Sequence, residues 1–149
     1  MMKSGVIIES VAKTVVVNGK NEALVLTIGD YKARPDKSHT PDLPGGQIEI
    51  ADGESEMIGA IREAEEEAGI VLKPEEMTLA YTKTRSYKDE NKSVSFFLYI
   101  AHLDYTPEVV ISWEHEKYEW VPIDHLLKTK TFRPFYKEGI EYAFDNKLL

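Results

Sequence analysis

Two short apolar runs near the N-terminus predict the first pair of β-strands. Val15 to Val17 and Ala23 to Ile28 are rich in β-branched and aliphatic residues, and Asn18-Gly19 lies between them. An Asn-Gly pair between such runs is a strong signal for a tight hairpin turn. The same strand pattern recurs in three later segments, Met77 to Thr84, Val94 to Leu103 and Trp120 to Pro122.

A helical period replaces this pattern between residues 57 and 70. Winding the segment at 100° per residue gathers its apolar side chains on one side and its acids on the other. Gly53 and Glu54 suit the start of such a helix, and Gly69 suits the left-handed position after its end. The predicted apolar side consists of Met57, Ile58, Ala60, Ile61, Ala64 and Ala68, and Glu63, Glu66 and Glu67 are predicted to face outward.

Two shorter helices are expected later, at Asp124 to Lys128 and Phe135 to Asn146. Gly29 to Pro41 is polar and predicts a long loop, and Ser86 to Lys92 predicts a turn between two strands. Strands and helices mixed in this order indicate an α+β sheet covered by helices. The 149 residues are 42% hydrophobic and carry no repeat or composition break, which predicts a single domain over residues 1–149.

Charge and cysteine content restrict the function. The net charge of −8 disfavours binding to extended nucleic acid, which draws on clustered Lys and Arg, but is compatible with a short nucleotide escorted by a divalent cation. Without cysteine the chain has neither disulfides nor a thiol nucleophile. The apolar run at the start is too short for a signal peptide, and no membrane segment is predicted, so the expected location is the cytoplasm.

The acidic stripe of the predicted helix is the strongest indication of chemistry. Glu63, Glu66 and Glu67 lie at i, i+3 and i+4 and repel one another, at about 0.2–0.5 kcal/mol per pair. A solvated charged face is the simpler interpretation, but such faces normally place Lys four residues from Glu, and this one does not. Oxygen ligands of this kind suit Mg²⁺, with Mn²⁺ as a substitute.

The surrounding residues resemble a known signature. Arg62 to Ile70 read Arg-Glu-Ala-Glu-Glu-Glu-Ala-Gly-Ile, and seven residues separate Arg62 from the preceding Glu54. The pattern is similar to that of the Nudix hydrolases, in which Gly, five residues, Glu and seven residues precede Arg-Glu-U-x-Glu-Glu-x-Gly-U, where U is apolar. The chain departs from it in one place, because seven residues separate Gly46 from Glu54. We interpret this as a two-residue insertion near Ile50 to Asp52.

The resemblance implies an α/β/α sandwich with a mixed β-sheet between helices, and Mg²⁺-dependent hydrolysis of a pyrophosphate bond. It implies that Glu63, Glu66 and Glu67 hold the metal together with the Gly45 carbonyl, and that Arg62 orients the glutamates. In the segment Glu114 to Trp120, which also resembles the family, Glu114 is the outlying carboxylate expected to join the metal cluster, with Glu116 and Glu119 as alternatives. Either Glu63 or Glu114 is the expected general base. Trp120 is interpreted as a core residue and His115 as a surface residue.

The sequence is compatible with several substrates. Arg34, Lys37 and His39 in the long loop are candidate phosphate or base contacts, and Gly46 is a candidate substrate contact. Tyr87 lies 17 residues beyond the signature, as in the diadenosine polyphosphate branch. A nucleoside triphosphate, an oxidised nucleotide and a dinucleoside polyphosphate are all admissible. A non-catalytic nucleotide sensor and an RNA 5′-end pyrophosphohydrolase remain alternatives, whereas isopentenyl diphosphate isomerases depend on a cysteine that this chain lacks. The resemblance is also compatible with a homodimer.

Overall fold

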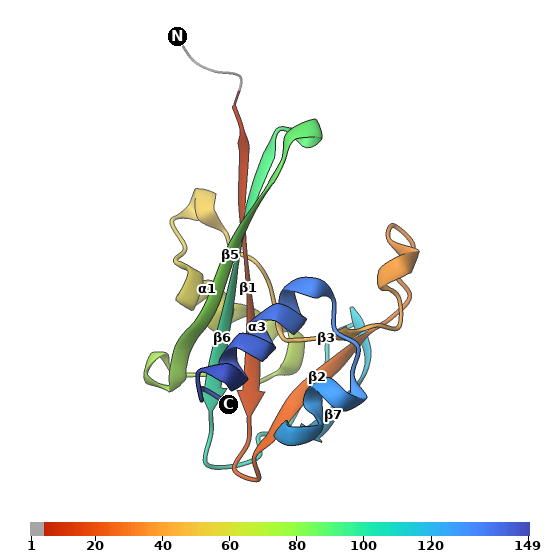
Figure 1. The fold of residues 1–149 in the computed structure, drawn as a ribbon, viewed down its shortest axis with the longest axis vertical. Coiled ribbons are helices and arrows are strands. Elements are labelled where there is room, and N and C mark those ends of the chain that lie inside the picture. The colour runs from red at the N-terminus through yellow and green to blue at the C-terminus, as the bar shows by residue number, and fades with distance from the viewer. Residues whose placement is uncertain (1–4) are drawn as a thin grey trace.

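A mixed β-sheet lies between helices in the computed structural model, which describes residues 5–149 (Figure 1). The strands are β1 (Ile7–Val17), β2 (Glu22–Ile28), β3 (Pro41–Asp42), β4 (Gly45–Gln47), β5 (Met77–Tyr87), β6 (Lys92–His102) and β7 (His115–Pro122). The α-helices are α1 (Glu56–Ala68), α2 (Leu126–Thr129) and α3 (Pro134–Asp145). Single 3-10 turns are η1 (Pro35–Lys37), η2 (Ile50–Asp52), η3 (Pro74–Glu76), η4 (Lys88–Glu90) and η5 (Ile123–His125).

The seven strands form one sheet in which the main order is β3-β2-β1-β6-β5. β1 and β6 are parallel over their whole length, while the other pairs are antiparallel, with β4 added to β1 and β7 added to β2. The β5–β6 hairpin and the start of β1 extend beyond the rest of the sheet, and η1 projects from the other side of the molecule (Figure 1). These two projections flank the candidate site.

The sheet buries both of its faces, because successive side chains on a strand point to opposite sides. On β1, Val15 and Val17 pack into a core with α3, whereas Ala12 and Val16 pack into a second core with α1. β2 and β6 alternate in the same way. Helices on both faces of a mixed sheet confirm the expected α+β sandwich.

Helix α1 confirms the predicted helical segment and corrects two of its details. Ser55 caps its N-terminus through the Ile58 amide, so Gly53 and Glu54 lie before the helix and belong to the turn that leads into it. Gly69 ends the helix with φ +69°, as predicted. Ile58 is 52% exposed, and Glu67 is only 5% exposed, so neither lies on the predicted side. Glu67 is buried because β4 packs over the last turn of α1.

The strands are longer than the sequence pattern predicts. β1 begins at Ile7 because β6 pairs with residues 7–17, a partner that lies far away in sequence. β5 continues to Tyr87, so Ser86 and Tyr87 belong to a strand and the turn consists of η4 and Asn91. β7 begins at His115, five residues before the predicted Trp120, because it pairs with β2 as far as Ile28. Among the residues described, none of the helices has the length and apolar content needed to cross a membrane.

Candidate active site

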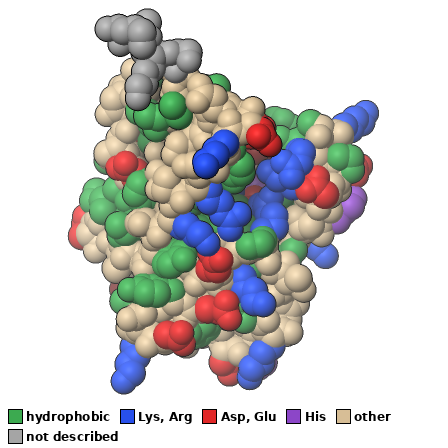
Figure 2. Space-filling view, turned by 45° about the horizontal axis from the view of Figure 1, so that its top comes forward, with side chains coloured by type: hydrophobic (Ala, Val, Ile, Leu, Met, Phe, Trp, Pro, Cys, Tyr) green, Lys and Arg blue, Asp and Glu red, His purple; other side chains and the backbone are tan. Residues whose placement is uncertain are grey.

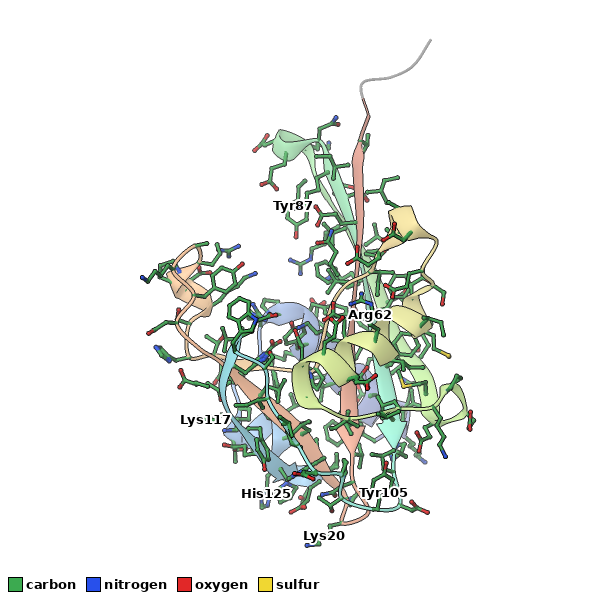
Figure 3. All side chains as sticks on the ribbon, turned by 180° about the vertical axis from the view of Figure 1, so that it is seen from behind. Lys20, Arg62, Tyr87, Tyr105, Lys117 and His125 are labelled. Carbon is green, nitrogen blue, oxygen red and sulfur yellow. The ribbon has the colours of Figure 1, made fainter. Side chains whose placement is uncertain are left out.

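A cleft of about 980 Å³ opens between the β5–β6 hairpin and the loop that carries η1. Figure 3 shows Tyr87 on the hairpin facing the gap that separates it from this loop. Of the chain's 18 Lys and Arg residues six line the cleft, against four of its 26 Asp and Glu residues. Lys and Arg side chains gather in a hollow on this face of the molecule (Figure 2). The cleft is therefore positively charged in a chain of net charge −8, as an anion site requires.

Glu67 is one of two buried carboxylates that line the cleft, the other being Asp42. Its Oε1 accepts a hydrogen bond from the Gly45 amide at 3.0 Å, which joins the end of α1 to β4. Burial raises the pKa of Glu67 to about 7 and outweighs the opposing effects of the Lys13 charge and the Gly45 amide. The folded protein thus holds a carboxyl group whose negative charge is incompletely compensated.

Gly45 is also held from its other side by Lys13 on β1. The Lys13 ammonium donates to the carbonyls of Gly45, at 3.1 Å, and Leu43, at 3.2 Å, as well as to Asp42 Oδ1 at 3.1 Å. With φ +148° and the Ala12 carbonyl against the position of a Cβ atom, residue 45 admits only glycine. The strand that positions Glu67 is thereby fixed by a buried cation.

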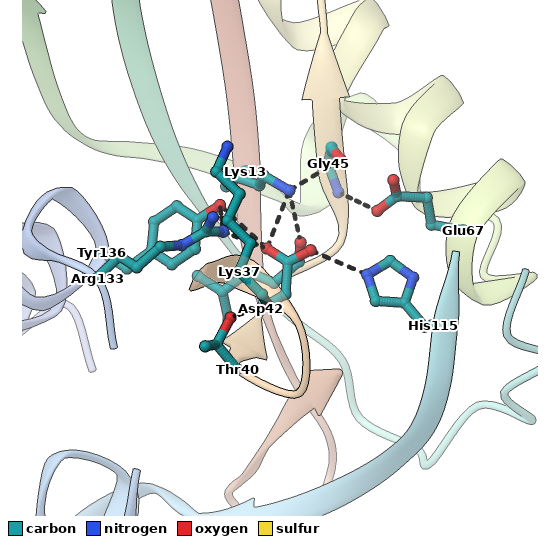
Figure 4. Close-up of polar contacts among 10 residues, drawn as sticks. Lys13, Lys37, Thr40, Asp42, Gly45, Glu67, His115, Arg133 and Tyr136 are labelled. Atoms are coloured by element: carbon teal, nitrogen blue, oxygen red, sulfur yellow. Dashed lines mark hydrogen bonds and ion pairs between the residues drawn. The ribbon is translucent and has the colours of Figure 1, made fainter. Parts of the chain in front are cut away.

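Asp42 is the centre of a buried polar cluster (Figure 4). Its carboxylate accepts hydrogen bonds from Lys13, from His115 Nε2 at 2.9 Å and from the Tyr136 hydroxyl at 3.0 Å. Arg133 lies 3.5 Å from Asp42 Oδ1 and donates to the Tyr136 hydroxyl at 3.0 Å. Burial alone would raise the pKa of Asp42, but Lys13 and His115 lower it well below its usual range. The cluster joins β1, β3, β7 and α3 at the floor of the cleft.

Arg62 organises the remaining acids of α1. It makes two hydrogen bonds to Glu54, at 2.7 and 2.9 Å, and contacts Glu66 at 2.9 Å and Glu63 at 3.3 Å. The bonds from Arg62, followed by one from the Glu49 amide, lower the pKa of Glu54 to about 2. Burial raises the pKa of Glu63, an effect that Arg62 opposes. The Glu63 carboxylate lies directly against Gly46, where an added Cβ would be 2.7 Å from Glu63 Cδ.

Comparison with known proteins agrees with this geometry. The NUDIX domain family matches residues 9–142 of the chain. The chain belongs to the Nudix family. It is 31% identical over 103 residues to the asymmetrical bis(5′-nucleosyl)-tetraphosphatase of Sus scrofa, covering 66% of this chain and 69% of that protein.

Two solved Nudix structures extend the comparison over nearly the whole fold. The MutT protein of Methanosarcina mazei Go1 has a TM-score of 0.77 at 24% identity, covering 97% of this chain and 99% of that one. A binary complex of the C. elegans Ap4A hydrolase has a TM-score of 0.61 at 25% identity, covering 93% and 97%. These similarities, together with the family match, confirm the expected Nudix pyrophosphohydrolase.

The signature glutamates divide into two groups in this Nudix protein. Glu67 lines the cleft with Gly45, Gly46 and Gln47, whereas Glu63 packs against Gly46 and the exposed Glu66 pairs with Arg62. The segment Ile50 to Asp52, interpreted above as the place of a two-residue insertion, forms η2 and is followed by Gly53 in a left-handed conformation. The insertion therefore lengthens the connection to α1 while Gly45 and Gly46 remain in contact with Glu67 and Glu63.

Among the described residues, the group whose ligand atoms are close enough to hold a metal includes Asp42, but the charges around Asp42 disfavour a cation there. Asp42, Glu67 and His115 could bring three ligand atoms within 4.8 Å of one another. Asp42, however, already accepts bonds from Lys13, His115 and Tyr136, and the Lys13 charge would repel a second cation. Glu67 and Glu63 carry raised pKa values and hard oxygen donors, which suits them to Mg²⁺ or Mn²⁺.

The other predicted site residues have different positions. Glu114, Arg34 and Tyr87 line the cleft, although Arg34 is paired with Asp36 at 2.9 Å. His39 is not among the lining residues, and its ring nitrogens contact Glu116 at 2.6 Å and Asp30 at 3.1 Å. Glu119, the other alternative, pairs with Lys130 at 2.6 Å. The structure thus leaves Glu114 as the carboxylate of its segment that faces the cleft.

Sequence reasoning missed the buried cluster and placed His115 wrongly. His115 is 6% exposed and bonded to Asp42, so it is an interior residue of the cleft floor and not a surface residue. The missed members are Lys13, Asp42, Arg133 and Tyr136, and the Asp42–Tyr136 hydrogen bond alone joins residues 94 positions apart. The available signal was a lysine two residues before the apolar run Val15 to Val17, since lysine is rarely buried without a partner.

Proposed function

We propose that this Nudix protein is a Mg²⁺-dependent hydrolase of nucleoside diphosphates linked to a further group. The class includes nucleoside triphosphates, oxidised nucleotides and dinucleoside polyphosphates. The observation that carries the proposal is the buried Glu67 carboxylate, held by the Gly45 amide at the floor of a positively charged cleft. A carboxylate with a raised pKa beside surplus cations is an arrangement for binding a metal and a phosphate chain together.

The cleft contains cations that the fold itself does not neutralise. Among residues 5–149, Lys32, Lys37 and Arg85 line the cleft without forming an ion pair. Burial, followed by the charges of Arg133 and Arg34, lowers the pKa of Lys37. Figure 4 shows Lys37 beside Arg133 at the cluster. Cations crowded in this way are stabilised by a polyphosphate, which is why we assign its phosphates to this part of the cleft.

Glu63, Glu66 and Glu67, with Glu114, are the residues proposed to hold the metal, whereas the Gly45 carbonyl expected to join them already accepts a hydrogen bond from the Lys13 ammonium at 3.1 Å. A bound Mg²⁺ supplies charge for the phosphoryl oxygens and lowers the pKa of a coordinated water. The protein's own contribution is positional. Arg62 fixes the orientation of Glu54, Glu63 and Glu66, while Lys37, Arg85 and Arg133 bind phosphate oxygens, and either Glu63 or Glu114 accepts the proton of the attacking water.

The relatives favour dinucleoside polyphosphates as the first substrates to test. The pig relative is named as a bis(5′-nucleosyl)-tetraphosphatase and the C. elegans structure as an Ap4A hydrolase. Tyr87 lines the cleft and is 37% exposed, so its ring is accessible to a ligand. The volume of about 980 Å³ is at the upper end of the roughly 300–1,000 Å³ typical of small-molecule sites.

The decisive experiment measures product release with Mg²⁺ from a panel of nucleoside triphosphates, dinucleoside polyphosphates, ADP-ribose and capped RNA ends. The Glu67→Gln variant should lose turnover by a factor of at least about 100 while its thermal unfolding stays cooperative. Glu65→Gln is the matched control, since Glu65 is an exposed acid of the same helix. Product release from RNA ends alone would show that the substrate is an RNA 5′ end and not a small nucleotide. Nucleotide binding without turnover would indicate a non-catalytic sensor.

A further inference from the structure

Trp113 has an unusual environment for a tryptophan. Its side chain lines the cleft yet is 92% exposed, whereas tryptophan is highly buried on average in folded proteins. It does not take part in the aromatic clusters of the core, which involve α3 and the sheet. Packing in the core therefore does not explain a tryptophan at this position, whereas contact with a ligand would.

The backbone around Trp113 is firmly held although its side chain is free. The Ser112 amide donates to the carbonyl of Glu67 at 3.0 Å, and the Glu114 carbonyl accepts from the Gly29 amide at 3.0 Å. His115 follows with its buried ring bonded to Asp42. Trp113 is thereby attached to the metal-binding end of α1 on one side and to the base of the η1 loop on the other. Because the backbone is held, only the two side-chain torsions of Trp113 are ordered when its ring contacts a ligand, and the entropy cost is small.

The charged and aromatic residues near Trp113 indicate the chemistry of the ligand that fits the cleft. Lys37 and Arg133 line the same cleft and attract phosphates, whereas the Trp113 indole offers a flat apolar face. Tyr31, 45% exposed in the η1 loop, lines the cleft as a second ring on this side. A phosphate chain ending in a flat heteroaromatic ring satisfies both requirements, and aromatic side chains stack on any base.

We propose that Trp113 is a stacking platform for a nucleobase of the substrate, so that the rim formed by Tyr31 and Trp113 selects base-bearing polyphosphates over those without a base. The inference rests on the proposed hydrolase function for its substrate, but it concerns binding and is testable without turnover. Trp113 acts here as a specificity-determining residue and has no part in the proton transfers.

The binding test uses metal-free protein, which does not need to be active. ADP should quench the fluorescence of the exposed Trp113, and inorganic tripolyphosphate should not. In Trp113→Phe the remaining signal comes from Trp120, which packs against the core, and the quenching by ADP should disappear. Equal quenching by tripolyphosphate, or quenching by ADP that persists in the variant, would overturn the proposal.

The kinetic test compares a nucleoside triphosphate with ribose 5-triphosphate, which has no base. Trp113→Ala should raise KM for the nucleotide by about 5- to 150-fold, the range that corresponds to the loss of one base–aromatic stack, and leave KM for the abasic compound unchanged. Trp113→Phe retains an aromatic ring, so its KM for the nucleotide should stay close to the wild-type value. Tyr105→Ala is the control, because Tyr105 is an exposed aromatic residue at the far end of the molecule from Tyr87 (Figure 3). Equal losses on both compounds would indicate a structural role and refute the platform. Inactivity of the wild type on both would remove nucleoside triphosphates from the proposed substrates, and the fluorescence result would then decide whether Trp113 is a platform.

Discussion

The Gly45 amide donates a hydrogen bond to the Glu67 carboxylate while the Gly45 carbonyl accepts one from Lys13. One residue, Gly45, therefore connects the buried Lys13 ammonium to the buried Glu67 carboxylate across β4. The distances are 3.0 Å on the Glu67 side and 3.1 Å on the Lys13 side. Because the amide supplies a single neutral donor, it positions the Glu67 carboxylate without compensating its whole charge. This leaves a carboxyl group that favours its protonated form when no metal is bound.

The stability of the metal-free protein should consequently depend on the ionisation of Glu67. Its pKa is about 7 when folded, against an ordinary value of 4.5, so the folded state binds more protons than the unfolded state between these values. Stability contributed by the protonated group is fully present below pH 4.5 and is lost as the pH rises through 7, by roughly 3 kcal/mol. In urea titrations with a chelator present, Glu67→Gln should gain stability relative to wild type as the pH rises from 5 to 8. A constant difference between the two proteins would refute the raised pKa.

Replacing Arg62 by Lys should weaken metal binding while leaving the fold intact. An ammonium group cannot reproduce the paired bonds to Glu54 and the bond to Glu66 at the same time. Loss of such a supporting contact typically lowers metal affinity or activity by about 10- to 100-fold. Isothermal titration with Mg²⁺ and kcat at saturating Mg²⁺ measure the two effects separately. An unchanged Mg²⁺ affinity in the variant would show that Arg62 does not orient the glutamates.

Substitution of Gly46 by Ala should act on Glu63 specifically. The new methyl group would lie 2.7–2.8 Å from the Glu63 carboxylate, and this flexible side chain can move aside. We expect the free energy of unfolding to change by less than about 1 kcal/mol while Mg²⁺ affinity falls by about tenfold or more. Gly45→Ala gives the contrasting result, because its methyl group would meet the Ala12 carbonyl and the folded state itself would be lost. Full metal affinity in the Gly46 variant would remove Glu63 from the metal site.

Local sequence signals identified most of the secondary structure. The period of residues 57–70 located α1, and the Asn18-Gly19 turn located the first hairpin, because both depend on neighbours within a few positions. The start of β1 and of β7 could not be predicted, since these residues become strands only by pairing with segments far away in the chain. The exposure of Glu67 was predicted wrongly for the same reason: β4 covers it, and no helical period describes a strand that crosses the helix.

The candidate site was predictable only where its residues are contiguous. The signature from Glu54 to Ile70 marks the acids and Arg62 directly. Asp42, by contrast, has no local pattern that separates it from an ordinary turn residue before Pro44, and its role arises from Lys13, His115 and Tyr136 meeting at one point. A cluster assembled from distant elements becomes visible only when the fold brings them together.

The Asp42 cluster should contribute strongly to stability, because removing its carboxylate leaves buried cations without a negatively charged partner. Lys13 is 8% exposed, and although burial lowers its pKa, the charges of Asp42 and Tyr136 raise it above the ordinary value. In Asp42→Ala the ammonium keeps only backbone carbonyl partners, and breaking a buried pair in this way typically costs about 3–5 kcal/mol. Asp36→Ala is the control, since the Asp36–Arg34 pair is exposed and such pairs contribute little to stability. Urea unfolding at pH 7 should therefore separate the two variants by at least about 2 kcal/mol, and equal midpoints would mean that Lys13 reaches solvent when Asp42 is absent.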